Sequence, residues 1–327
     1  MEKRVEVSKK PKFTVTYQKI LVVLLIGLIA LFALLEEGII LKPSVLFGLT
    51  ENVVEVGLMA LALTFIITTG GIDLSVGSTM ALSAVILGWT YETTNNIALA
   101  IVLCILTGLA CGALNGLIIA KTKIAPLVTT LATMSLYYGI AKIISGTKIF
   151  STYPEGFKFL AFRRLFNIIP YQFVLFVVVF VLFAVFFYRS NIGRYLRSIG
   201  YREKAAKFMG VGVESVKFGI YTLTGLVCSI ASIIYLSRLP AAKPDIGLNL
   251  NLEAITAVVL GGTSIMGGIG SVTGTFIAVL VLGVLRKGMQ LIRLGGDVYN
   301  FILGIILVIC LISFSYLDSM EKKRSGG

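Results

Sequence analysis

The sequence predicts an all-α, polytopic membrane protein with almost no soluble domain of its own. Of its 327 residues, 57% are hydrophobic and 14% are charged, whereas a soluble globular chain carries about 25% charged residues. Apolar runs close to the roughly 20 residues that cross a bilayer recur along nearly the whole chain. Histidine is absent, which excludes metalloprotease motifs and imidazole general bases. We expect no catalytic residue and no metal site.

Ten apolar runs separated by short polar gaps set the expected domain organisation. Residues 1–17 are predicted to form a basic tail, residues 18–317 one transmembrane domain of about ten transmembrane helices, and residues 318–327 a second tail. The runs lie near residues 18–35, 52–69, 75–90, 97–120, 124–145, 170–188, 218–237, 251–268, 271–288 and 298–317.

The positions of the basic residues predict the orientation in the membrane. The formal net charge is +13, but Lys and Arg lie in the gaps between apolar runs instead of forming a basic domain, so we expect no nucleic acid partner. Placing both tails, residues 121–123 and residues 189–217 in the cytoplasm puts 18 of the 29 basic residues there, counting Lys19. Both termini are therefore predicted to be cytoplasmic.

Glycine is concentrated in particular runs and turns. Gly108, Gly112 and Gly116 recur at helical spacing, and such stripes let helices approach closely; a pathway wall or a subunit interface is the alternative. The segments 70–78 (GGIDLSVGS) and 261–274 (GGTSIMGGIGSVTG) each join two apolar runs through glycine and hydroxyl residues. Their similarity suggests a weak internal repeat. In transporters, glycine-interrupted segments at corresponding positions of two halves point to the transport site.

The chain lacks the common machinery of an enzyme. It has no Gly-Lys dipeptide and hence no Walker A loop, and no G-x-S-x-G nucleophile elbow. Ion-coupled transporters need ionisable groups within the membrane, and the candidates are three carboxylates. Asp73 is interpreted as a cap of the following helix, Glu253 as a first-turn residue and Glu55 as interfacial. No proton relay is visible.

The longest polar stretch, residues 189–221, predicts a docking element. It carries six basic residues between Arg189 and Lys207 and contains a helix-favouring piece, residues 203–209, ended by Gly210. A solvated positive-inside loop would explain the charge but not this short helix with a glycine stop. We expect it to contact a cytoplasmic partner.

Four long segments resemble the permease subunits of bacterial ABC importers for simple sugars, of the ribose-transporter type. The resemblance covers nearly the whole chain after the N-terminal tail. The segments are GGIDLSVGS (70–78), NGLIIAKTKIAPLVTTLATM (115–134), IGRYLRSIGYREKAAKFMGV (192–211) and LEAITAVVLGGTSIMGGIGSVTGTFIAVLVLGVLRKGMQLI (252–292).

This resemblance implies a type II importer fold in the bacterial inner membrane. It implies a second permease copy or paralogue, an ATPase with two cassettes, and a solute-binding protein on the outer side. ATP and Mg would be bound by the ATPase, so this chain is expected to hold no cofactor and to be no enzyme. The family's cytoplasmic coupling motif corresponds to six residues. They are Arg194, Glu203, Ala205, Ala206, Met209 and Gly210.

Polar side chains within the matched segments are the candidates for the translocation pathway. A sugar needs hydrogen bonds, yet it must be released, so a sparse lining of hydroxyls and amides is expected. Bonding between helices is the competing interpretation of each. The candidates are Asp73, Ser75, Ser78, Asn115, Thr130, Thr133, Thr263 and Ser264.

Four basic residues of the outer loops are candidates for steering an acidic face of a binding protein. They are Arg163, Arg164, Arg238 and Lys243. Contact with lipid headgroups is the alternative role for these side chains.

The sequence leaves the cargo open. Ribose, another pentose, galactose, a nucleoside or a furanosyl signalling molecule all fit the resemblance. A permease for branched-chain amino acids is a close alternative in fold, an ion-coupled secondary transporter is an alternative of another class, and a channel or structural subunit is a third.

Overall fold

The computed structural model describes residues 12–42, 45, 48, 53–122, 124–158, 163–166 and 168–324. Each of the ten apolar runs contains an α-helix, so the all-α class is confirmed. The helices are α1 (Lys12–Leu35), α3 (Val54–Thr68), α4 (Val76–Thr94), α5 (Ile97–Lys121), α6 (Pro126–Ser145), α8 (Tyr171–Arg189), α11 (Val213–Arg238), α12 (Leu250–Leu260), α13 (Val272–Leu291) and α14 (Gly296–Arg324).

The remaining elements are short. Two helices follow α8, namely α9 (Asn191–Tyr201) and α10 (Glu203–Phe208). Strands β1 (Arg164–Leu165) and β2 (Ile169–Pro170) pair antiparallel. Three 3-10 turns are η1 (Ile39–Leu41), η2 (Glu155–Lys158) and η3 (Pro244–Gly247).

Within the described residues, 6 helices are long and apolar enough to cross a membrane, namely α1 from Gln18 onward, α5, α6, α8, α11 and α13. Two further apolar helices are shorter, α3 and the part of α14 from Gly296 to Ile312. The 11 residues of α12 span about 16 Å, which is less than a hydrocarbon core. About ten spans is therefore an approximate count, because α3, α12 and the apolar part of α14 are shorter than the six candidate spans.

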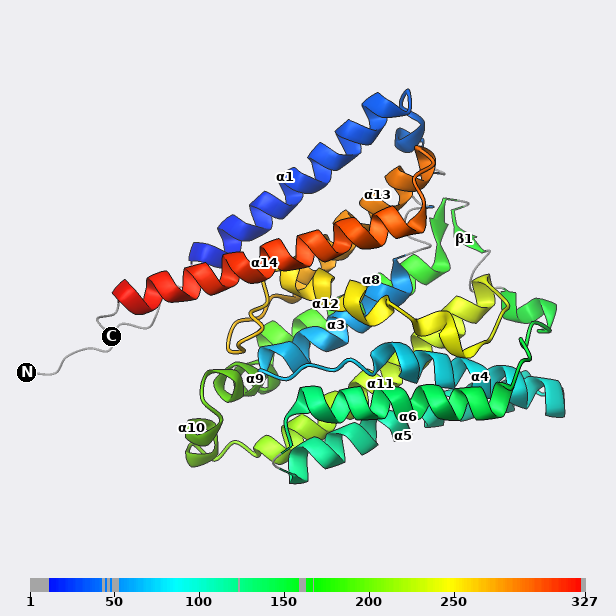
Figure 1. Ribbon diagram of the computed structural model, residues 1–327, viewed down its shortest axis with the longest axis horizontal. Coiled ribbons are helices and arrows are strands. Elements are labelled where there is room, and N and C mark those ends of the chain that lie inside the picture. The colour runs from blue at the N-terminus through cyan, green and yellow to red at the C-terminus, as the bar shows by residue number, and fades with distance from the viewer. Residues whose placement is uncertain are drawn as a thin grey trace, which may run out of the picture.

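The helices lie side by side along the long axis of the molecule (Figure 1). The first residues of α1, the last residues of α14, and α9 and α10 all lie at one end. Strand β1 lies at the opposite end. The predicted docking stretch thus shares one side of the bundle with both terminal helices.

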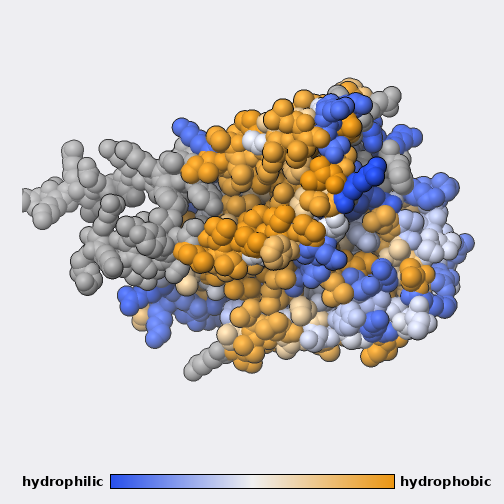
Figure 2. All heavy atoms as spheres, turned by 45° about the horizontal axis from the view of Figure 1, so that its top comes forward, coloured by the Kyte–Doolittle hydropathy of each residue, from blue (hydrophilic) through white to orange (hydrophobic). Residues whose placement is uncertain are grey.

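The outside of the bundle is suited to lipid. Hydrophobic residues cover the middle of the face in Figure 2, and hydrophilic residues gather towards its ends. Large apolar side chains stand fully outward, such as Leu34, which is 83% exposed, and Ile143, which is 84% exposed. A soluble protein would not tolerate so large an apolar surface.

Helices α5 and α11 pack backbone to backbone, as the glycine stripe predicts. A Cβ atom on Gly108 would lie 2.3 Å from the carbonyl oxygen of Gly225, and one on Gly112 would lie 2.4 Å from that of Tyr221. The structure therefore confirms tight packing at Gly108 and Gly112. In a membrane such close approach supplies the dispersion contacts that hold helices together.

One predicted span is wrong in its extent. The run 251–268 is apolar enough to suggest a single helix, but α12 ends at Leu260. Gly261 follows as its C-cap and Gly262 has a φ of 89°, a conformation that side chains disfavour. The glycines therefore stop the helix early and open a turn that leads into α13.

Candidate functional site

The chain between α3 and α4 is non-helical and lies inside the bundle. After α3 it runs back alongside the helices as an extended segment before α4 begins (Figure 1). Gly71, Asp73 and Ser75 in this segment are buried. Non-helical backbone at membrane depth needs protein or water to bond its polar groups, so the partners of residues 71–75 define a candidate site.

Two side chains from distant helices bond the backbone of this segment. The hydroxyl of Thr130 on α6 accepts from the amide of Leu74 at 3.2 Å and donates to the carbonyl of Ile72 at 3.1 Å. The amide of Asn251 on α12 donates to the carbonyl of Leu74 at 3.2 Å. The extended conformation is thus held from both sides by groups that replace a helix's own hydrogen bonds.

A buried polar network continues from the same segment into α5 and α6. Oδ1 of Asp73 accepts from the amide and hydroxyl of Ser75, at 2.8 and 2.7 Å. Asn115 donates to the Ser75 hydroxyl at 2.8 Å, and Tyr137 donates to Asn115 Oδ1 at 3.0 Å. Asp73 therefore bonds Ser75, which is the N-cap of α4, so it supports the start of the helix without being the predicted cap itself.

The structure brings five of the eight predicted pathway residues to this segment. Asp73, Ser75 and Asn115 share the network, and Thr130 bonds the adjacent backbone. Thr133 donates to the Thr130 carbonyl at 3.3 Å. Their hydrogen bonds fit the alternative role of joining helices, and their part in a pathway stays a prediction.

The other predicted pathway residues lie elsewhere. Ser78 is half-buried in the first turn of α4. Thr263 and Ser264 lie in the turn between α12 and α13, where the Thr263 hydroxyl accepts from the amide of Ser271 at 3.2 Å. Sequence reasoning missed Asn251 and Tyr137, which lie just outside the matched segments. Their signal was a polar side chain inside a predicted apolar run.

The two glycine-rich segments meet at the end of the bundle that carries α9. The amide of Gly268, in the turn after α12, donates to the carbonyl of Thr68, the last residue of α3, at 2.8 Å. A Cβ on Gly267 would lie 2.9 Å from the amide nitrogen of Gly70. The two glycine-rich segments are therefore neighbours in space, and the internal repeat stays a prediction.

Helix α9 is inserted at this meeting point through Gly200. A Cβ on Gly200 would lie 2.1 Å from the Thr68 carbonyl oxygen and 2.2 Å from the Gly268 amide nitrogen. Both atoms belong to the backbone and cannot rotate away. Any residue other than glycine would push α9 off the two turns. We call Gly200, Thr68 and Gly268 the glycine junction.

The predicted coupling residues lie in α9, α10 and the turn after α10, which pack together and which we call the coupling unit. Ala206 is fully buried and packs with Ile199 of α9 and Val213 of α11. The sequence predicted Ala206 as a residue of the coupling motif, and the structure places it inside the unit. Gly210 follows α10 with a φ of 83°, which agrees with the predicted glycine stop. Ala205 is half-buried.

Ion pairs tie the coupling unit to the start of α11. Lys217 pairs with Glu203 at 2.8 Å, and Lys207 pairs with Glu214. The hydrogen bond to Glu214 raises the pKa of Lys207, so its ammonium stays charged at neutral pH. These four side chains line a cleft of about 400 Å³ beside the α5–α6 turn.

Two large apolar side chains of the coupling unit point into solvent. Phe208 is 91% exposed and Met209 is 69% exposed. Arg194, also predicted, is exposed on α9 and bonds Asn191. Sequence reasoning missed Phe208, because a phenylalanine in an amphipathic piece suggests its buried face. An exposed aromatic and methionine together are typical of an interface anchor.

The predicted outer basic residues fall into two groups. Arg163 and Arg164 are exposed at the β1 end, and Lys243 pairs with Asp245 at 3.2 Å. Arg238 instead bonds the buried carboxylate of Glu55 at 2.7 Å. Arg238 therefore has a structural partner within the bundle, and docking by any of the four residues stays a prediction.

The third intramembrane carboxylate also has partners. Glu253 lies in the first turn of α12, as predicted. It accepts from Tyr299 at 2.5 Å and pairs with Arg286 at 3.3 Å. Glu55 and Glu253 are thus matched by arginines and Asp73 by Ser75, an arrangement that suits a fixed scaffold better than a proton relay.

Comparison with known proteins assigns the chain to a family. The family described as branched-chain amino acid transport system / permease component matches residues 45–311. The chain belongs to this family. The permease is therefore a multi-pass membrane protein of an importer, and the resemblance drawn from the four motif segments is confirmed.

Curated relatives cover the permease nearly from end to end. The autoinducer 2 import system permease protein of Enterobacter sp. (strain 638) is 36% identical over 94% of this chain and 96% of the relative. Proteins of the same name from Klebsiella pneumoniae and Photorhabdus temperata are each 35% identical, over 96% and 90% of this chain and 96% and 90% of the relative. No solved structure matches the permease.

Proposed function

We propose that the chain is the membrane subunit of an ATP-driven importer and that a separate ATPase docks on the coupling unit. The observation that carries this proposal is the exposed Phe208–Met209 pair, held on a short helix that ion pairs fix to α11. The sequence contains no Walker A loop, so in this proposal ATP is hydrolysed by the partner. Closure of the ATPase would move α9 and α10, and the attached helices would switch the pathway from outward-open to inward-open.

The cargo we propose is a small, hydroxyl-rich furanosyl compound, either autoinducer 2 or a monosaccharide such as ribose, another pentose or galactose. The names of the curated relatives favour autoinducer 2. The family description names branched-chain amino acids, which makes leucine the alternative cargo to test. In either case we propose that the pathway passes the polar network around Asp73 and Asn115, which contains three of the predicted pathway residues.

The proposed assembly has two permeases, one ATPase with two cassettes and one solute-binding protein. The end of the bundle that carries α9 and α10 also carries the first residues of α1 and the last of α14, and we assign it to the cytoplasm of a bacterial cell. The opposite end, with Arg163 and Arg164, would then receive the binding protein. Their charge would act mainly on the association rate.

Truncating Phe208 to alanine is expected to weaken binding of the ATPase roughly tenfold to hundredfold, the usual range for an aromatic anchor. Because the side chain is 91% exposed, the thermal stability of the permease should not change. Affinity of the purified ATPase for the permease in nanodiscs measures the effect. Lys204→Ala, at an exposed position of the same helix, is the matched control and should alter affinity little. Equal affinities for the two variants would overturn the proposed docking.

A further inference from the structure

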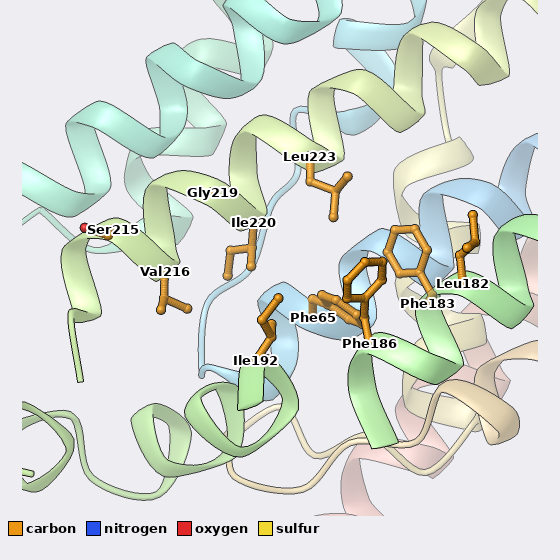
Figure 3. A pocket seen from close by; sticks show the side chains of 10 residues that line it. All are labelled: Phe65, Leu182, Phe183, Phe186, Ile192, Ser215, Val216, Gly219, Ile220 and Leu223. Atoms are coloured by element: carbon orange, nitrogen blue, oxygen red, sulfur yellow. The ribbon is translucent and has the colours of Figure 1, made fainter. Parts of the chain in front are cut away.

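A large apolar cavity opens beside the coupling unit, away from the polar network. Its volume is about 450 Å³, within the range of about 300–1,000 Å³ typical of small-molecule pockets. Figure 3 shows side chains of α11 along one side and side chains of α8 facing them, with Phe65 of α3 and Ile192 of α9 between. Among the described residues that line the cavity, Ser215 alone carries a side-chain oxygen.

The cavity lies where helices leave the membrane. Phe186 is one turn before the end of α8, Ile192 is the second residue of α9, and Ser215 is the third residue of α11. The lining is also open outward, because Phe186 remains 48% exposed and Ile192 remains 38% exposed. The opening therefore faces the outer part of one leaflet, on the side of α9 and α10.

The apolar lining and the nearby charge favour a lipid as the ligand of this cavity. Apolar surface in this position is next to lipid tails, and the lining offers no set of polar groups to hold a soluble ligand. Arg189 is exposed and lies three residues beyond Phe186, on the same face of α8. A cation at this level attracts anionic headgroups.

We propose that the cavity binds one acyl chain of an anionic phospholipid from the leaflet on the α9–α10 side, with its headgroup at Arg189. Phe65 in the lining is three residues before Thr68 of the glycine junction. The lipid therefore fills the space between α8 and α11 next to the point where α9 meets α3. If the proposed coupling through α9 is correct, anionic lipid stabilises the geometry of that contact, but the binding itself does not depend on the transported cargo.

Tryptophan quenching by brominated lipid tests the site. The chain contains one tryptophan, so Trp89→Phe gives a background in which Phe186→Trp reports on the cavity. Val185→Trp is the matched control, because Val185 is adjacent, 52% exposed and outside the lining. The permease is placed in nanodiscs with a minor fraction of phosphatidylglycerol or phosphatidylcholine brominated on the acyl chain.

Brominated phosphatidylglycerol should quench Phe186→Trp at a concentration about fivefold lower than brominated phosphatidylcholine, the factor expected for one arginine near a headgroup. Val185→Trp should show no such preference. Equal behaviour at the two positions would show ordinary boundary lipid and overturn the proposal. Absence of quenching at Phe186→Trp would overturn it too, since protein would then cover the cavity.

A variant that fills the cavity provides the second arm. A Cβ on Gly219, which lines the cavity on α11, would meet nothing within 4 Å. Gly219→Leu should therefore fold and should remove the preference for phosphatidylglycerol at Phe186→Trp. Gly139→Leu on α6 also has no neighbour within 4 Å and should keep it. A preference that survives Gly219→Leu would exclude this cavity as the binding site.

Discussion

Replacing Gly200 with alanine is expected to reduce transport by roughly tenfold to hundredfold while the permease still reaches the membrane. The added Cβ would lie 2.1 Å from the Thr68 carbonyl oxygen and 2.2 Å from the Gly268 amide nitrogen. Overpacking of this kind costs about 1–3 kcal/mol. The strain is relieved when α9 moves away from the turns after α3 and α12, so motion of the coupling unit would no longer reach them.

Uptake per assembled complex, measured together with ATPase binding, separates this effect from a failure to assemble. The matched control is Gly212→Ala, which lies between α10 and α11. A Cβ there would come no closer than 3.9 Å to the side chain of Ser215. We expect near-normal uptake for Gly212→Ala. Near-normal uptake for Gly200→Ala would contradict a mechanical role for the glycine junction.

Replacing Asp73 with alanine is expected to destabilise the permease strongly. The amide and hydroxyl of Ser75 would both lose their acceptor, which now lies at 2.8 and 2.7 Å. A buried polar group left without a partner costs about 1–3 kcal/mol, and two such groups lie in the same extended segment. The conformation of residues 71–75 depends on these bonds, so we expect loss of most folded protein.

The fraction of monodisperse protein that survives heating in detergent measures this loss. Asp73→Asn keeps a side-chain carbonyl that can accept from Ser75, and it should retain much more folded protein than Asp73→Ala. Equal survival of Asp73→Ala and the unmodified permease would contradict the structural role. Normal stability combined with lost uptake would instead assign Asp73 to the pathway.

The helices could be predicted from the sequence because apolar runs of sufficient length have few alternatives in a bilayer. The break in the run 251–268 was harder, because Gly261 and Gly262 act locally within an apolar context. The bonding of Ile72 and Leu74 by Thr130 depends on a residue far along the chain. Such pairings arise from tertiary packing, which hydropathy does not report.

In residues 189–221, too, the burial of single residues could not be predicted from the sequence. The position of this stretch and its glycine stop at Gly210 could be read from charge and composition. Which face of α10 is buried could not be predicted, because that burial depends on packing against α11. Ala206 is buried against Val213, and Phe208 is exposed. Nothing in the sequence distinguishes Gly200 from other glycines. Only glycine fits there because the backbone of two distant segments occupies the space that a Cβ would need.

The most direct test of the central claim is ATP-driven uptake by the complete system. The permease would be reconstituted into proteoliposomes with the proposed ATPase and solute-binding protein of the same organism, and uptake of autoinducer 2, ribose and leucine would be measured. We predict uptake of autoinducer 2 or ribose that requires ATP, the ATPase and Phe208. Uptake by the permease alone, driven by an ion gradient and indifferent to the ATPase, would contradict the account.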